Sequence, residues 1–187
     1  MTVGHGLHFG NRGGVFRLRI VGGNHAGRHL TSPQDQRVRP TAEATRDGIM
    51  KLLGTRLQDA RVLDLFAGTG ALGLEAISRG AASGDFVEIR PDSLHALKAN
   101  IAALGLRGNT RVFKKDAIPF AESLPEGAYD IAFADPPYGT KMLDRIVAAW
   151  QKKKFARVLV AEHKADQDVL RGSQRKRFDD TAVTIYI

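Results

Sequence analysis

The chain contains no cysteine and no long apolar run, and each absence removes a class of protein. Without cysteine, disulfides, thiolate metal sites and thiol nucleophiles are all excluded. No stretch approaches the roughly 20 apolar residues that a membrane-spanning helix requires. The N-terminus also lacks an apolar signal region, so we expect a cytoplasmic protein without a metal cofactor.

The remaining composition is that of an ordinary globular protein. The 187 residues are 43% hydrophobic and 26% charged, and only 7% are aromatic. This length accommodates one α/β domain with a small extension.

The positive charge is concentrated at the two ends of the chain. Residues 1–60 contain nine Lys/Arg and four Asp/Glu, a net charge of +5, and residues 151–187 contain nine and five, a net charge of +4. Residues 61–150 contain ten and eleven, a net charge of −1. This distribution indicates a polyanionic partner held by the flanks, although a generally basic protein without such a partner would have the same total.

The first 40 residues are expected to form a basic N-terminal arm and a β-hairpin extension. Residues 15–21 alternate apolar and basic side chains, which is typical of a half-exposed strand. Turn-forming residues follow at 22–24, and a short strand around 28–30 completes the hairpin.

Residues 41–187 are expected to form a single α/β domain. After a helix near 42–53, strands and helices alternate, which predicts a Rossmann-like, mostly parallel sheet with helices on both faces. Strands are expected at 61–65, 85–89, 110–114, 129–134 and 156–161, and helices near 71–79, 91–104, 117–123 and 141–152. Two last strands, at 174–178 and 182–187, have no room for a helix between them and should be antiparallel neighbours.

A glycine-rich loop follows the first strand of this domain. Gly68, Gly70 and Gly73 have the spacing of a dinucleotide fingerprint, and Glu88 follows Gly68 by twenty positions, where a carboxylate can accept hydrogen bonds from ribose hydroxyls. The spacing alone fits NAD or S-adenosylmethionine. Asp64 before the loop would repel a pyrophosphate but attract an α-amino group or a sulfonium. Residues 62–78 also contain no basic residue, which favours S-adenosylmethionine.

Asp116 follows the strand at 110–114 and has two interpretations. It is placed to accept a hydrogen bond from the adenine amine of such a ligand, or it caps the helix that begins at Ala117.

The stretch Asp135-Pro136-Pro137-Tyr138 follows the strand at 129–134. The two prolines end the strand and leave Asp135 at its carboxyl end, where α/β sheets bind ligands. An acid, a rigid turn and an aromatic ring suit a planar base that is stacked and held by its exocyclic amine. A strand-ending turn with a solvated acid and a packed tyrosine is the structural alternative.

With these motifs the chain resembles the bacterial 16S rRNA guanine-N2 methyltransferases of the RsmD type, within the class I S-adenosylmethionine-dependent enzymes. The stretches that carry the resemblance are Arg19-Ile20-Val21-Gly22-Gly23, Gly27-Arg28-His29-Leu30, Arg39-Pro40-Thr41, 63–76, Val87-Glu88, Asp135-Pro136-Pro137-Tyr138 and 180–186. The glycine loop and the acidic turn are common to many amine methyltransferases, whereas the arginine-rich front end is more specific.

The resemblance implies a seven-stranded sheet whose seventh strand is antiparallel. It implies donor contacts from Asp64, Phe66, Gly68, Gly70 and Glu88, with Asp116 near the adenine. It also implies that the Asp135–Tyr138 turn holds the target guanine. We expect Arg17, Arg19, Arg28 and Arg39 to hold RNA phosphates, the partner to be 16S rRNA or a small-subunit particle, and the protein to be a monomer.

Three other interpretations remain open. The first is an amine methyltransferase that acts on DNA adenine or another RNA, although the chain is short for a separate DNA-reading domain. The second is an NAD-dependent oxidoreductase, for which no catalytic Tyr/Lys or His pair is evident. The third is a non-catalytic RNA-binding module, which the presence of Asp64, Glu88 and the Asp135–Tyr138 turn disfavours.

Overall fold

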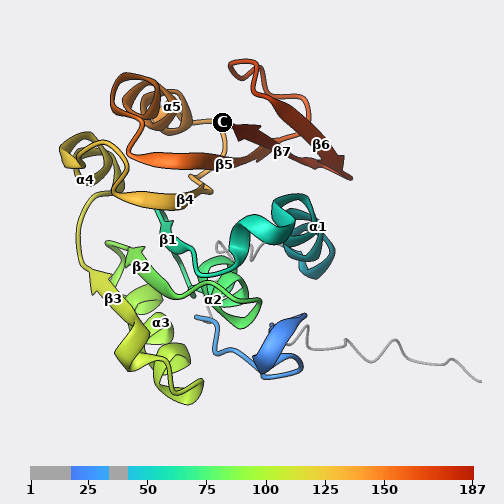
Figure 1. Ribbon diagram of the computed structural model, residues 1–187, viewed down its shortest axis with the longest axis vertical. Coiled ribbons are helices and arrows are strands. Elements are labelled where there is room, and N and C mark those ends of the chain that lie inside the picture. The colour runs from blue at the N-terminus through green and yellow to red at the C-terminus, as the bar shows by residue number, and fades with distance from the viewer. Residues whose placement is uncertain (1–17, 34–41) are drawn as a thin grey trace, which may run out of the picture.

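The computed structural model describes residues 18–33 and 42–187, which form a seven-stranded sheet with helices on both faces (Figure 1). The strand order is β3-β2-β1-β4-β5-β7-β6. The strands are β1 (Arg61–Asp64), β2 (Ser83–Val87), β3 (Thr110–Phe113), β4 (Tyr129–Ala134), β5 (Ala156–Lys164), β6 (Gln174–Phe178) and β7 (Thr181–Tyr186). The first five strands run parallel, and β7 pairs antiparallel with both β5 and β6. The predicted α/β fold with an antiparallel seventh strand is therefore confirmed.

The five α-helices cover the sheet in two layers. They are α1 (Glu43–Leu53), α2 (Ala71–Ser78), α3 (Pro91–Ala103), α4 (Ala117–Ser123) and α5 (Met142–Lys153). Successive strand residues point to opposite faces, so Val62 packs in the cluster formed with α1, α2 and α3, whereas Leu63 packs with α4 and α5. Burial on both faces explains why the central strand β4 is almost continuously apolar. None of the helices in the described part of the chain has the length and apolar character needed to cross a membrane.

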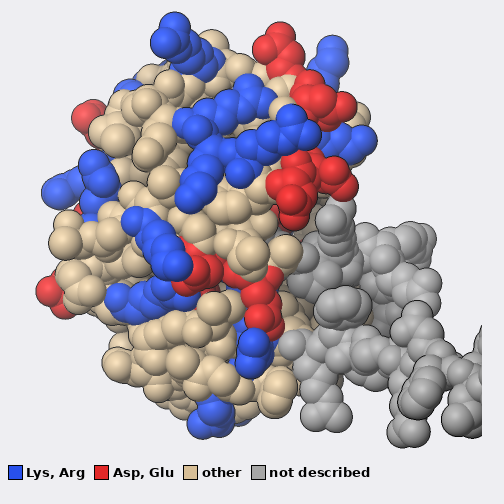
Figure 2. Space-filling view, turned by 90° about the vertical axis from the view of Figure 1, so that its right-hand side faces the viewer, with Lys and Arg blue, Asp and Glu red and all other residues tan. Residues whose placement is uncertain are grey.

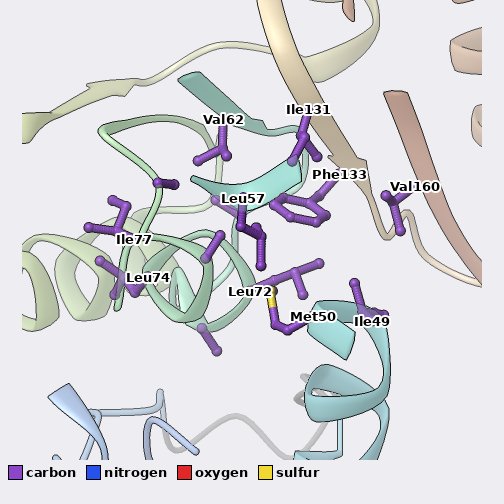
Figure 3. Packing of buried hydrophobic residues seen from close by; sticks show 14 of the residues in the cluster. Ile49, Met50, Leu57, Val62, Leu72, Leu74, Ile77, Ile131, Phe133 and Val160 are labelled. Atoms are coloured by element: carbon purple, nitrogen blue, oxygen red, sulfur yellow. The ribbon is translucent and has the colours of Figure 1, made fainter. Parts of the chain in front are cut away.

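The larger cluster centres on Phe133 of β4, which packs among residues of β1, β5, α1 and α2 (Figure 3). Phe133, Ile49 and Leu74 have no exposed surface. Each such side chain stabilises the fold by about 1.5–3 kcal/mol relative to an exposed one. This packing fixes the carboxyl end of β4 against β1, where the candidate site lies.

The N-terminal segment packs onto α1 and α2. Leu18, Ile20 and Leu30 are buried in the same cluster as these helices. The hairpin is minimal: Arg19 and His29 form one antiparallel bridge, and Leu30 donates a backbone hydrogen bond to Leu18 at 2.8 Å. Residues 15–17 of the predicted strand, and the predicted boundary near residue 40, lie outside the described residues.

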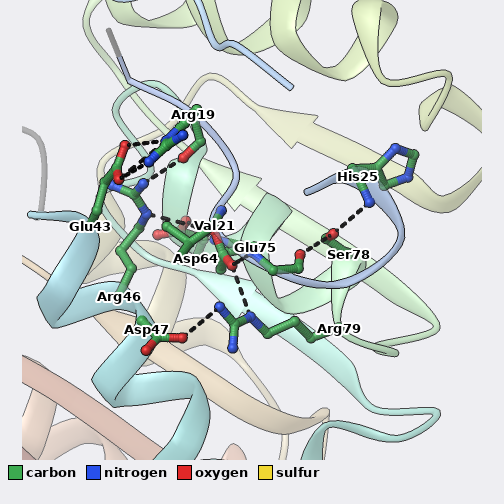
Figure 4. Close-up of polar contacts among 12 residues, drawn as sticks. Arg19, Val21, His25, Glu43, Arg46, Asp47, Asp64, Glu75, Ser78 and Arg79 are labelled. Atoms are coloured by element: carbon green, nitrogen blue, oxygen red, sulfur yellow. Dashed lines mark hydrogen bonds and ion pairs between the residues drawn. The ribbon is translucent and has the colours of Figure 1, made fainter. Parts of the chain in front are cut away.

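A buried polar network joins this segment to α1 and α2 (Figure 4). The carboxylate of Glu75, which has no exposed surface, accepts hydrogen bonds from the backbone N–H groups of Val21 and Gly22, each at 2.8 Å. It also accepts one from Arg79 Nε at 2.8 Å, and Arg46 donates to the carbonyl of Arg19 at 2.6 Å. The sequence analysis did not identify this network.

The carboxyl ends of two strands differ from the prediction by more than one residue. Strand β5 continues to Lys164, three residues beyond the expected end, because it pairs with β7 as far as the Lys164–Thr181 register position. The extension brings Glu162 into the sheet. Strand β2 ends at Val87, so Glu88 lies one residue after the strand rather than within it.

Candidate active site

The carboxyl ends of β1, β2 and β4 open into one cavity of about 510 Å³. It combines the glycine-rich loop with the proline-rich turn, which are separated by more than 60 residues in sequence. Acidic side chains and one tyrosine supply much of its polar wall: Asp64, Glu88, Asp116, Asp135, Glu162 and Tyr138. The structure therefore brings together the predicted donor site and the predicted acceptor site.

The loop after β1 is shaped by backbone conformations that most residues avoid. Gly68 has φ 54° and Gly70 has φ 80°, both in the left-handed region that favours glycine. Phe66 has φ 115°, which is strained for a residue with a side chain and is often retained near functional sites. Gly68 and Phe66 line the cavity. Gly70 is not among the lining residues; a Cβ there would lie 2.4 Å from Leu97 Cδ1, so its role is to allow close packing behind the loop.

Asp64 is a buried acid of the site with a raised pKa. Its side chain is buried, and Oδ2 accepts a hydrogen bond from the Gly73 N–H at 3.0 Å. Burial raises the pKa of Asp64 to about 7, with a further increase from the nearby Glu88 charge and an opposing decrease from the Gly73 hydrogen bond. A cationic ligand in the cavity would favour the ionised form of this acid.

Glu88 organises the loops on both sides of it. Oε2 accepts a hydrogen bond from Gly68 N at 2.8 Å, and Oε1 accepts from Ile89 N at 2.9 Å and Arg90 N at 2.8 Å. A carboxylate has about four acceptor positions, and backbone N–H groups occupy three of those of Glu88. The buried Glu88 carboxylate thus holds the glycine loop while lining the cavity.

Asp116 caps α4, as one of its two predicted interpretations has it, and it also lines the cavity. Its Oδ1 accepts a hydrogen bond from Ile118 N at 2.9 Å, which caps α4. Its side chain also lines the cavity, so the cap places a carboxylate there. Contact with adenine stays a prediction.

The Asp135–Tyr138 turn begins where β4 ends, as the prolines predict. Asp135 is half-buried, Pro136 is buried and Pro137 is exposed, and all three line the cavity with Tyr138. The carbonyl of Pro137 accepts a hydrogen bond from Thr140 Oγ1 at 2.8 Å, which tightens the turn before α5.

Two residues that the sequence analysis missed also shape this end of the cavity. The Tyr138 hydroxyl lies 3.0 Å from Thr181 Oγ1 and 3.4 Å from Glu162 Oε1. Glu162 and Thr181 are buried and lie on β5 and β7. Their signal in the sequence was an acid and a hydroxyl within otherwise apolar strands.

Comparison with known proteins shows the family to which this chain belongs. The sequence model of the family described as Conserved hypothetical protein 95 matches residues 18–186. Ribosomal RNA small subunit methyltransferase D of Escherichia coli K12 is 37% identical over 138 residues, which cover 73% of this chain and 68% of that protein. The chain belongs to this RsmD-type methyltransferase family. The resemblance is confirmed, so the oxidoreductase and the non-catalytic module are set aside.

Two solved structures resemble this methyltransferase in fold. The Escherichia coli protein yhhF superposes with a TM-score of 0.78 at 30% identity, over 91% of this chain and 97% of that one. An RNA methyltransferase of Salinibacter ruber, solved with S-adenosyl-L-homocysteine, superposes with a TM-score of 0.61. It is 14% identical, and the match covers 79% of this chain and 92% of that one, so it bears on the fold alone.

The two predicted RNA-binding arginines that the structure describes, Arg19 and Arg28, are not among the residues that line the cavity of this methyltransferase. Arg19 forms an ion pair with Glu43 at 3.1 Å, and its side chain remains 52% exposed. Arg28 is exposed and donates a hydrogen bond to the Ala103 carbonyl at 2.7 Å. Arg17 and Arg39 lie outside the described residues. The phosphate-binding role of all four stays a prediction.

Proposed function

We propose that this protein transfers a methyl group from S-adenosylmethionine to the exocyclic N2 of a guanine in 16S rRNA. The observation that carries the proposal is one cavity that holds both the Asp64–Glu88 loop region and the Asp135–Tyr138 turn. The naming of a 37% identical relative as a small-subunit rRNA methyltransferase supports the substrate class. We propose that the enzyme works in the cytoplasm, as a monomer, on naked rRNA or on a small-subunit particle.

The donor end of the cavity fits S-adenosylmethionine through its acids and its loop. Asp64 would face the cationic part of the ligand, and Glu88 and Asp116 would hold its ribose and adenine. Gly68 admits a ligand closely, because the nearest atom to a Cβ there is 4.0 Å away and belongs to the loop itself. When bound, the ligand supplies a methyl group on a positively charged sulfur.

The acceptor end must orient a poor nucleophile, because the lone pair of guanine N2 is delocalised into the ring. The Asp135 carboxylate and the Pro136 carbonyl each accept an N–H of the amine, which directs the lone pair toward the donor end. Tyr138 stacks on the base after it leaves its own stack. Reactants that are aligned in this way react as if one of them were present at an effective concentration on the order of 10⁵ M or more.

Asp135 also acts through its charge. As N2 forms its new bond to carbon, it acquires positive charge, and a fixed carboxylate nearby stabilises that charge. The N–H proton that is lost in the product leaves N2 to Asp135 or to water. The catalytic set is therefore Asp135, Pro136, Pro137 and Tyr138.

The direct test is transfer of tritiated methyl groups to rRNA and to assembled small subunits, with the modified nucleotide mapped by mass spectrometry. We expect N2-methylguanine from the wild type and loss of turnover in Asp135→Ala with donor affinity retained. Glu126→Ala, an exposed acid on a loop away from the cavity, is the matched control. Near wild-type turnover of Asp135→Ala, or a methylated adenine as product, would contradict the proposal.

A further inference from the structure

Strand β6 is an edge strand of the sheet and carries three consecutive cations. Arg175, Lys176 and Arg177 are all exposed, and among the strands of the described residues β6 pairs with β7 alone. On the face of the molecule that contains this edge, Lys and Arg side chains gather in the upper part (Figure 2). The edge lies opposite the N-terminal segment, which packs on α2 and α3 (Figure 1).

These three side chains are not engaged in ion pairs with acids of the described residues. Within residues 18–33 and 42–187, none of the three forms an ion pair, whereas Arg19, Arg79, Arg111 and Arg145 each do. This holds although Asp179 and Asp180 follow the strand directly. The three cations therefore remain available to pair with an anionic ligand.

Neutral contacts hold the three cations in place. Arg175 Nη2 donates to the carbonyls of Ala165 at 3.0 Å and Gln167 at 3.3 Å. Arg177 Nε donates to the Asp179 carbonyl at 2.9 Å, and Lys176 Nζ lies 5.2 Å from the centre of the Phe178 ring. A guanidinium has five N–H groups, so these contacts leave donors for an anion. Partial ordering of long side chains reduces the entropy lost on binding.

The sheet register relates this edge to the catalytic turn. Ala134 pairs with Ala161, so the next residue, Asp135, lies in the row of Glu162 on β5. Glu162 pairs with Val183, and Val183 pairs with Lys176. Three strand spacings separate Asp135 from Lys176, a distance of about 14 Å. Nucleotides adjacent to one whose base enters the cavity can therefore reach the β6 edge.

We infer that the β6 edge is a second phosphate-binding surface, which holds the RNA strand on the side of the cavity opposite to the N-terminal segment. Its occupant is the phosphodiester backbone next to the target nucleotide, and the inference rests on the proposed function. Edge cations also prevent strand-to-strand aggregation, but that role has no effect on RNA affinity. Phosphate contacts release counterions, so this surface contributes to the salt dependence of RNA binding.

The test replaces the three cations by glutamine and follows RNA binding at several salt concentrations. The variant is Arg175→Gln/Lys176→Gln/Arg177→Gln, and the control triple removes the same charge from exposed positions elsewhere, Arg107→Gln/Lys152→Gln/Arg157→Gln. We expect the slope of log K against log salt to become shallower by about 2, at about 0.7 per phosphate contact on a single strand. The KM for rRNA should rise roughly tenfold while kcat and donor affinity stay unchanged.

A double variant tests whether a folding defect of the triple variant accounts for its change in RNA binding. Lys176→Gln/Arg177→Gln leaves the hydrogen bonds from Arg175 to the 165–167 loop intact and should make the slope shallower by about 1.4. Arg175→Lys/Arg177→Lys keeps the charge and should retain most of the wild-type slope. A slope for the folded β6 variants equal to that of the control triple would overturn the inference. If the wild type methylates no RNA, the proposed function fails instead.

Discussion

The hydroxyl of Tyr138 lies 3.0 Å from Oγ1 of Thr181, which joins the turn after β4 to the first residue of β7. The two residues are 43 positions apart in sequence. Thr181 is buried, and β7 reaches the site only because it pairs antiparallel with β5. A strand that supplies no acid to the reaction thus positions the ring that is proposed to stack on the base.

Replacing Tyr138 by phenylalanine should distinguish the stacking of its ring on the base from the positioning of that ring by its hydroxyl. The ring is retained, but the contacts of its hydroxyl with Thr181 and Glu162 are lost. We expect kcat to fall about tenfold, with a smaller change in the KM for rRNA, because a less ordered ring aligns the base less well. Tyr138→Ala should raise that KM as well, and equal kinetics for the two variants would contradict the separation. Steady-state methyl transfer measures both.

Asp64→Asn should stabilise the ligand-free protein at high pH. The pKa of Asp64 rises from 3.8 to about 7 on folding, so the folded state holds more protons than the unfolded state between these values. Stability conferred by the protonated acid is therefore lost as pH rises through this window. We expect the variant to melt above the wild type at about pH 8, with a smaller difference at about pH 5.

The same variant should bind S-adenosylmethionine weakly and with little pH dependence. Wild-type affinity should increase between about pH 6 and pH 8, because a cationic ligand favours the ionised acid. Asp92→Asn, an exposed acid in the first turn of α3, is the control for both measurements. A wild-type affinity that is flat across this range would contradict the role given to Asp64.

The two glycines of the loop should differ in what their substitution disturbs. Gly70→Ala combines φ 80° with a Cβ 2.4 Å from Leu97 Cδ1, so we expect a loss of about 2–4 kcal/mol of stability. Gly68→Ala has φ 54° and no such clash, so the loss should be about 1 kcal/mol. Gly68 lines the cavity, so Gly68→Ala should weaken donor binding more than Gly70→Ala does, relative to the stability that each variant loses. Calorimetric titration measures the donor affinity, and urea unfolding measures the stability.

Glu75→Gln should destabilise the attachment of the N-terminal segment. Glu75 is fully buried and bonds Val21, Gly22 and Arg79, so its removal leaves Arg79 and Arg46 without their shared carboxylate. We expect a loss of about 3 kcal/mol, as for other broken buried ion pairs. Glu43→Gln removes an exposed pair with Arg19 and should cost less than about 1 kcal/mol. Equal losses in urea unfolding would contradict the importance of the network.

Most of the elements were predictable because their signals are local. The prolines at 136 and 137 cannot continue a strand, so the end of β4 at Ala134 follows from the sequence. The helix over 117–123 and the strand over 174–178 were likewise located correctly, from periodicity and from their flanking residues. The rule that ligands bind at the carboxyl ends of parallel strands singled out Asp64, Glu88 and Asp135, and all three line the cavity.

The residues that were missed depend on contacts between distant segments. Glu162 enters the cavity because β5 is lengthened by pairing with β7, and its pairing partner Val183, 21 residues away, leaves no local signal. Glu75 looked like an ordinary helix residue, yet it is buried because the N-terminal segment covers it.

By itself, the sequence determined the order of strands and helices, the methyltransferase family and the main acids of the site, because these follow from periodicity, turn chemistry and motif spacing. Only the tertiary structure decided which buried groups support those acids, how far Asp64 is shifted toward its neutral form and where β6 lies relative to the catalytic turn. Burial and strand register are properties of the packed chain, since each depends on segments that meet only after folding.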